Sequence, residues 1–179
     1  MGDLRPESCC LIISDIHERL GVVTTDLWQE LEQAEHACFL GDWFDTFDIY
    51  SEDRVAQVCQ WLVQHVGRED WTFLAGNHDV HYMSGAGLYG CSGYSSRTNQ
   101  IVQSLIPKNI WRKFKVSTKV GPYLVSHAGY TERTLQYASD EVGSEAIEAA
   151  LANRYDPLFG AGRARGGNLM EGGPLWLDW

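Results

Sequence analysis

The sequence has no apolar run of the roughly 20 residues that a helix needs to cross a bilayer. Its first residues, Met1 to Glu7, carry charged side chains at Asp3, Arg5 and Glu7 and lack the basic-then-apolar order of a signal peptide. We therefore expect a cytoplasmic protein that does not bind membranes.

The chain also lacks a C-x-x-C pair, and its 5 cysteines are odd in number. A disulfide-bonded secreted domain fits neither this count nor the missing signal. Four of the cysteines lie in apolar surroundings, where a thiol behaves as a small hydrophobe, and we expect them to be buried and reduced: Cys9, Cys10, Cys38 and Cys59.

Positive charge is scarce, with 14 lysines and arginines against 24 aspartates and glutamates and a formal net charge of −10. This balance argues against broad binding to nucleic acid or to anionic membranes. It does not exclude a phosphorylated substrate, because bound divalent ions can reverse the sign of the potential in a cleft of carboxylates.

What the chain does contain is a regular alternation of apolar patterns over 179 residues, the size of a single domain covering residues 1–179. Cys9 to Ser14, Ala37 to Leu40 and Trp71 to Ala75 are short continuous apolar runs, typical of strands buried on both faces. Helical spacing of apolar residues predicts helices from about Thr25 to Ala34 and from Ser51 to Val66. This β-α-β-α-β order predicts parallel strands and an α/β fold.

The second half has weaker patterns. We predict a loop from His81 to Tyr94, a helix from Arg97 to Ile106, and a hairpin of Trp111 to Lys119 with Tyr123 to Ser126. A weakly patterned helical region follows from about Glu132 to Arg154, and the remainder is rich in glycine.

Polar clusters follow each of the three predicted parallel strands. They begin at Asp15, Gly41 and Gly76, and read Asp-Ile-His, Gly-Asp-Trp-Phe-Asp and Gly-Asn-His-Asp. Each is separated from the next by about one βαβ unit, so all three should emerge at the carboxyl edge of the sheet, where α/β proteins bind ligands. A fourth cluster, Ser-His-Ala-Gly from Ser126, ends the hairpin.

The side chains in these clusters are carboxylates, imidazoles and an amide, which are ligands for manganese, iron or zinc. Taken alone, Asp-x-His would usually be incidental, and a single His127 is as well explained by a structural hydrogen bond. Four clusters in order, each at a strand end, make coincidence a poor explanation.

The motifs DIH, GDWFD, GNHD and SHAG resemble those of the calcineurin-like metallophosphoesterases, in the branch that contains phage-type and bacterial protein phosphatases. The resemblance covers residues 9–130 strongly. It implies an α/β fold of the αββα sandwich type, with two mixed sheets and helices outside, in a bacterial cell or the cytoplasm of a phage-infected host.

The resemblance also implies a site with two divalent ions, manganese by preference and iron or zinc as alternatives. Five side chains would hold the ions: Asp15, His17, Asp42, Asn77 and His127. Asp42 would bridge the ions, and a hydroxide between them would attack phosphorus. His78 would be the general acid, and Asp45 would orient it.

Two features depart from the family pattern. The arginine that usually follows the second motif is replaced, since Asp45 is followed by Thr46 and Phe47. The final Gly-His motif is missing before Trp179, so we expect a domain that lacks its last strand or strands. As substrate-binding residues we predict Arg97, His81 and Tyr94, with solvated charge or a surface loop as the alternative.

The predicted function is metal-dependent hydrolysis of a phosphomonoester, either a phosphoprotein or a small phosphorylated metabolite. A phosphodiesterase or nucleotide pyrophosphohydrolase of the same fold is one alternative. A non-catalytic scaffold is another alternative, which the missing final histidine and the missing arginine favour and the convergent ligands oppose. The oligomeric state is open.

Overall fold

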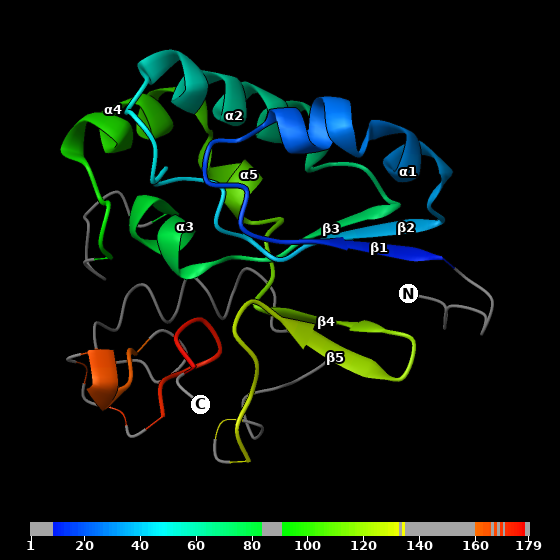
Figure 1. Cartoon of the computed structure of the whole chain (residues 1–179), viewed down its shortest axis with the longest axis vertical. Coiled ribbons are helices and arrows are strands. Elements are labelled where there is room, and N and C mark those ends of the chain that lie inside the picture. Colours follow the sequence, from blue (N-terminus) through cyan, green and yellow to red (C-terminus); the bar gives the residue numbers. More distant parts are fainter. Residues whose placement is uncertain are drawn as a thin grey trace.

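A computed structural model describes residues 9–83, 91–132, 134, 160–165, 167, 169 and 171–177. Figure 1 shows a sheet of three strands with helices α1, α2 and α4 above it and a two-stranded hairpin below it. The predicted α/β class is confirmed.

The upper sheet has the order β1-β2-β3, formed by Cys10–Ile13, His36–Phe39 and Trp71–Phe73, and both pairs are parallel. Ile13 pairs with Phe39, which pairs with Phe73, so the three strands end at nearly the same level. This register brings the segments that follow the strands to one edge, as predicted.

Strands β2 and β3 are buried along their whole length, but β1 is not. Ile12 is 48% exposed, and Cys9 is exposed just before the strand. The expectation of burial on both faces is therefore wrong for β1, which lies at the edge of the described sheet, and wrong for Cys9. Cys38 and Cys59 are buried and free, as predicted, and burial raises the pKa of each thiol to about 12.

The first crossover contains a π-helix, η1 (Val22–Asp26), and a short α-helix, α1 (Trp28–Gln33), where one helix was predicted. The second crossover contains α2 (Glu52–His65), which confirms the prediction. The Oγ atom of Ser51 accepts a hydrogen bond from the backbone N–H of Arg54 at 3.4 Å and so caps α2.

Aromatic side chains fill the core around the ends of β2 and β3. The rings of Phe39 and Phe73 stack with centroids 4.8 Å apart, and those of Trp43 and Trp61 lie 5.2 Å apart. Trp43 is fully buried and directly follows Asp42, so its packing against Trp61 of α2 fixes the segment after β2.

Helix α3 (Asn77–Met83) begins at the third polar cluster, so the prediction of a loop from His81 is wrong as far as Met83. Helix α4 (Ser96–Leu105) confirms a predicted helix. Helix α5 (Lys108–Trp111) replaces the start of a predicted strand, because its buried residues Ile110 and Trp111 follow Pro107, which suits a helix start.

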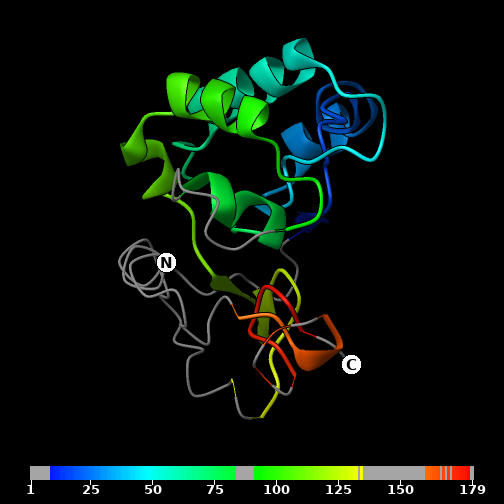
Figure 2. The ribbon, with the colours of Figure 1, turned by 90° about the vertical axis from the view of Figure 1, so that its left-hand side faces the viewer.

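The lower hairpin consists of β4 (Ser117–Val120) and β5 (Tyr123–Ser126), which are antiparallel with Ser117 opposite Ser126. A short 3₁₀ helix, η3 (Arg163–Arg165), belongs to the later segment that lies near this hairpin in Figure 2. The N–H of Ala128, just after β5, donates to the carbonyl of Pro174 at 2.9 Å and so joins the hairpin to this later segment. The predicted helical region from Glu132 to Arg154 falls almost wholly outside the described residues.

None of the helices in the described ranges is long and apolar enough to span a membrane.

Two glycines allow the segments after β2 and β3 to touch. Gly41 has φ +101°, and a Cβ atom there would lie 2.2 Å from the backbone nitrogen of Gly76. A Cβ atom on Gly76 would lie 2.2 Å from Oδ1 of Asp42. Any other residue at either position would push these segments apart.

We predict that Gly76→Ala lowers the free energy of unfolding by about 1–3 kcal/mol, because the new methyl group overlaps the Asp42 carboxylate and backbone. Urea denaturation measures this. Gly21→Ala is the matched control, since nothing lies within 4 Å of the added Cβ there and the change should be small. Equal effects at the two positions would contradict the account.

Candidate metal centre

The five predicted metal ligands come from four strand ends. Asp15 and His17 follow β1, Asp42 follows β2, Asn77 opens α3 after β3, and His127 follows β5. Ligand atoms of Asp15, His17 and Asp42 all lie within 4.8 Å of one another. Asp42 also lies 3.5 Å from Nε2 of His127, so the structure brings together residues that are 85 positions apart in the sequence.

The backbone is strained where it presents these ligands. Asp15, His17 and Asp42 have φ values of 56°, 44° and 59°, in the left-handed region that such residues rarely adopt. Hydrogen bonds between the two segments hold them there: the His17 N–H donates to the Asp42 carbonyl at 2.8 Å, and the Glu18 N–H donates to the Trp43 carbonyl at 2.9 Å. Strain of this kind concentrates at functional sites.

The imidazole of His17 has a fixed orientation. Its Nδ1 lies 2.9 Å from the carbonyl oxygen of Phe44 and 3.0 Å from that of Asp45. Because a carbonyl can only accept, Nδ1 carries the hydrogen and Nε2 is left as the metal-binding atom. Nε2 lies 3.7 Å from Oδ1 of Asp15 and 3.6 Å from Oδ2 of Asp42.

His127 is oriented in the same way on the other side of Asp42. Its Nδ1 donates to the carbonyl of Leu40 at 2.9 Å. Its Nε2 lies 2.8 Å from Oδ1 of Asn77 and 3.5 Å from Oδ2 of Asp42. In a neutral imidazole this nitrogen is an acceptor facing two acceptor oxygens, which a cation between them would satisfy. The donor set therefore fits a divalent metal.

Asp79 holds the two touching segments together, a role that we did not predict. Its Oδ2 accepts hydrogen bonds from the N–H groups of Asp42 at 2.8 Å and Gly76 at 2.9 Å, and its Oδ1 accepts one from Trp43 at 2.9 Å. Complete burial and the nearby charge of Asp42 raise the pKa of this carboxyl, although the three N–H groups oppose the rise. The only sequence signal is its place in Gly-Asn-His-Asp.

His78 and Asp45 form the predicted pair. His78 Nδ1 lies 2.9 Å from Asp45 Oδ2. Burial alone would lower the pKa of His78, but the bond to Asp45 and the contact with Cys91 raise it to about 10. The His78 N–H also donates to Oδ1 of Asp42 at 3.0 Å, which ties this pair to the metal ligands.

Asp45 has further partners on α3. His81 Nε2 lies 3.0 Å from Oδ2 of Asp45, and the Tyr82 hydroxyl donates to Oδ1. Burial raises the pKa of the Asp45 carboxyl, but the polar contacts with His78, His81 and Tyr82 outweigh burial and lower it overall. Asp45 is thus held as a carboxylate, the form that orients a protonated His78.

Of the three predicted substrate-binding residues, His81 and Tyr94 lie together and Arg97 lies apart from them. His81 is fully buried behind Asp45, and the ring of Tyr94 packs 5.1 Å from it. Arg97 is exposed at the start of α4 and forms an ion pair with Glu52 of α2. Cys91 lies closer to the ligands, with Sγ 3.2 Å from Nδ2 of Asn77.

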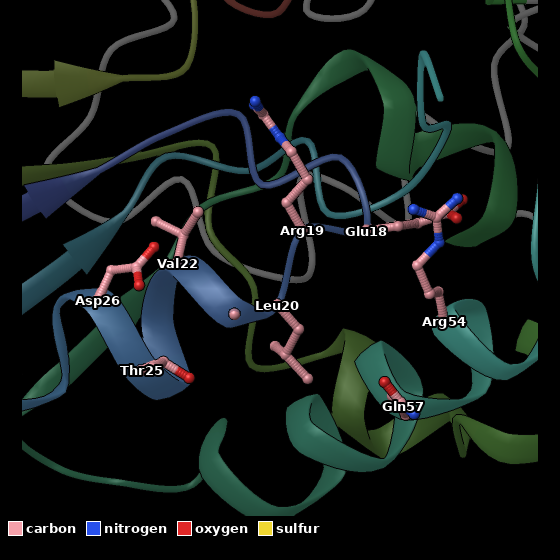
Figure 3. Close-up of a pocket in the computed structure, with 9 residues that line it drawn as sticks. Glu18, Arg19, Leu20, Val22, Thr25, Asp26, Arg54 and Gln57 are labelled. Atoms are coloured by element: carbon pink, nitrogen blue, oxygen red, sulfur yellow. The ribbon is translucent and has the colours of Figure 1, made fainter. Parts of the chain in front are cut away.

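A cavity of about 460 Å³ lies on the flank of the site, next to Glu18 and Arg54. Figure 3 shows its wall, formed by the segment after β1 and by α2. A smaller hollow of about 260 Å³ is lined in part by Asp45 and Tyr50. None of the five metal ligands lines either one.

Carboxylates, imidazoles and an amide thus meet at the carboxyl edge of a parallel sheet, beside a His–Asp pair, in an arrangement that could hold divalent metal ions. The chain belongs to the calcineurin-like phosphoesterases, whose family model matches residues 10–171. This family hydrolyses phosphoesters with divalent metal ions.

Solved structures of similar fold include the cold-active protein-tyrosine phosphatase of the psychrophile Shewanella sp., at 19% identity and a TM-score of 0.58. The match covers 98% of this chain and 60% of that one. An isoleucine-to-methionine mutant of a cold-active protein tyrosine phosphatase matches at 18% identity and a TM-score of 0.57, over 97% of this chain and 59% of the other. The chain thus spans about three fifths of these relatives. No curated protein matches.

In the metal-free protein we predict that His78 stays protonated well above pH 8, because its pKa is raised to about 10. This raised pKa stabilises the fold fully below about pH 6.5, and the contribution is lost as the pH rises through about 10. Nuclear magnetic resonance of the imidazole rings measures the titration. Asp45→Asn should move it down towards the ordinary range.

His36 is the internal control for this titration, because burial lowers its pKa. The two histidines should therefore titrate on opposite sides of the ordinary value in one set of spectra. A His78 that titrates with or below His36 would contradict the assignment of the His78–Asp45 pair.

Proposed function

We propose that this chain hydrolyses phosphomonoesters, carried by a phosphoprotein or a small metabolite, with two divalent ions. Manganese is the preferred ion, and iron or zinc are alternatives, since mixed oxygen and nitrogen ligands suit all three. Family membership supports the coarser part of this proposal, metal-dependent phosphoester hydrolysis.

The observation that carries the proposal is the position of Oδ2 of Asp42. It lies 3.6 Å from Nε2 of His17 and 3.5 Å from Nε2 of His127. Asp15 adds a carboxylate on the His17 side, and Asn77 adds an amide oxygen on the His127 side. Two cation positions that share one carboxylate oxygen explain this arrangement better than a single position does.

When bound, the ions would supply a hydroxide nucleophile at neutral pH and neutralise the phosphoryl oxygens. The chain's own contribution is His78, whose Nδ1 is occupied by Asp45. Its Nε2 is therefore the atom that would give a proton to the leaving-group oxygen. The names of the similar solved structures, protein-tyrosine phosphatases, support a monoester over a diester.

We further propose a cytoplasmic location, which the 5 free cysteines support. Nucleic acid and anionic membranes are not expected as partners, because the formal net charge is −10.

Hydrolysis of p-nitrophenyl phosphate and of bis-p-nitrophenyl phosphate, each with and without manganese, tests the function. We expect manganese-dependent turnover that favours the monoester and that Asp42→Asn reduces to the level without manganese. A preference for the diester would replace the proposal by a phosphodiesterase. Turnover of neither substrate by a manganese-loaded chain would favour a scaffold.

The general-acid role predicts a dependence on the leaving group. His78→Asn should lower kcat by about 10²–10⁴-fold, because the proton donor is lost. The loss should be larger for phenyl phosphate than for p-nitrophenyl phosphate, since phenolate needs protonation more. Steady-state assays measure this once the variant and wild type are shown to bind the same amount of manganese. Equal losses on the two esters would contradict this role.

A further inference from the structure

The loop that follows Asp45 exposes large apolar side chains beside the candidate metal centre. Phe47 is 81% exposed, Ile49 is 89% exposed, and Tyr50 is 39% exposed. The core does not use the Phe47 ring, so its exposure needs another explanation. Exposed apolar groups that gather next to a site commonly serve recognition.

The position of the Phe47 ring relates it to the reaction. Its centroid lies 4.7 Å from that of His17, a candidate metal ligand, and 6.3 Å from that of His78. His78 is the proton donor of the proposed function, so the leaving group must pass close to it. Because the Phe47 ring lies near both histidines, it borders the place where the leaving group would depart.

We propose that Phe47 receives the aromatic ring of the leaving group and that the substrate is an aryl phosphate. This inference rests on the proposed function and names its substrate class. Aromatic rings attract one another at centroid separations of about 4.5–7 Å, and the ring of a phenyl ester would fall beside Phe47 when its oxygen faces His78. An aliphatic phosphoserine has no ring to place there.

The composition of the loop agrees with this assignment. Asp45 is followed by Thr46 and Phe47, neither of which is charged. Phe47 and Ile49 then expose apolar surface on either side of Asp48. Ile49, two residues beyond Phe47, is exposed and would be available to residues that flank a phosphotyrosine.

The reaction is balanced with water as the only co-reactant. The water oxygen forms the new bond to phosphorus, and the bond between phosphorus and the aryl oxygen breaks with its electron pair on that oxygen. The proton of His78 Nε2 neutralises it. The attacking water releases one proton to solvent, and His78 regains one from solvent, so no net proton is left over. The products are inorganic phosphate and a phenol.

Phe47→Ala tests the inference when the variant is compared with wild type on each substrate separately. We expect kcat/KM on phenyl phosphate to fall by about 3- to 10-fold, mostly through KM, because an aromatic contact is lost. Phosphoserine should change by less than about 2-fold, since the remaining site is intact. Phe47→Tyr should retain the activity on phenyl phosphate.

Tyr123→Ala is the matched control, because Tyr123 is also an exposed aromatic residue, at 71%, but lies at the far end of β5. It should leave both substrates unchanged. Equal losses on phenyl phosphate and phosphoserine in Phe47→Ala, or a loss on phenyl phosphate in Tyr123→Ala, would overturn the inference.

A binding measurement separates this inference from the proposed function. Titration calorimetry of the manganese-loaded chain compares phenylphosphonate with methylphosphonate, neither of which is hydrolysed. Wild type should bind phenylphosphonate more tightly, and Phe47→Ala should remove the difference. This result without turnover of any ester would overturn the function but keep the aryl site, whereas equal binding of both phosphonates by wild type would overturn the aryl site.

The variant Ile49→Ala distinguishes two possible sources of the aryl phosphate, a phosphotyrosyl protein and a small molecule. If the substrate is a phosphotyrosyl protein, this change lowers kcat/KM on a phosphotyrosyl peptide but not on phenyl phosphate. If it is a small aryl phosphate, both are unchanged. A loss on phenyl phosphate equal to that of Phe47→Ala would contradict the placement of the ring at Phe47.

Discussion

The contact between the segments that follow β2 and β3 is the constraint on which the rest of the site depends. Gly41 and Gly76 permit it because neither has a side chain, and Asp79 fastens it through three backbone N–H groups. Oδ2 of Asp42 lies near Nε2 of His17, and its Oδ1 accepts the His78 N–H. The candidate metal ligands and the proposed proton donor are therefore positioned by one piece of backbone.

The same arrangement concentrates acceptor atoms that repel one another in the absence of a cation. Oxygen atoms of Asp15, Asp42 and Asn77 converge on the Nε2 atoms of two imidazole rings. The hydrogen of each ring is on Nδ1, which donates it to a backbone carbonyl. The fold maintains this unfavourable convergence through buried aromatic packing and the bonds to Asp79. Metal binding would relieve it, and metal affinity would then be coupled to folding stability.

The sequence predicted the convergence of the candidate ligands better than it predicted their surroundings. Short apolar runs followed by glycine and polar residues are enough to place Asp15, Asp42 and Asn77 at one edge of a sheet. Helix α3 has no apolar periodicity because its buried face is polar, so the sequence does not predict it and instead predicts a loop from His81. On a helix, His78, His81 and Tyr82 share one face, which explains why all three reach Asp45. Such tertiary partners have no local signal.

The central claim, that Asp42 is shared by two cations, is tested most directly by electron paramagnetic resonance of the manganese-loaded chain. Two manganese ions bridged by Asp42 would lie about 3.5–4 Å apart, and the account predicts an exchange-coupled signal that Asp42→Asn abolishes. An uncoupled signal from a single manganese ion at saturating metal would contradict it.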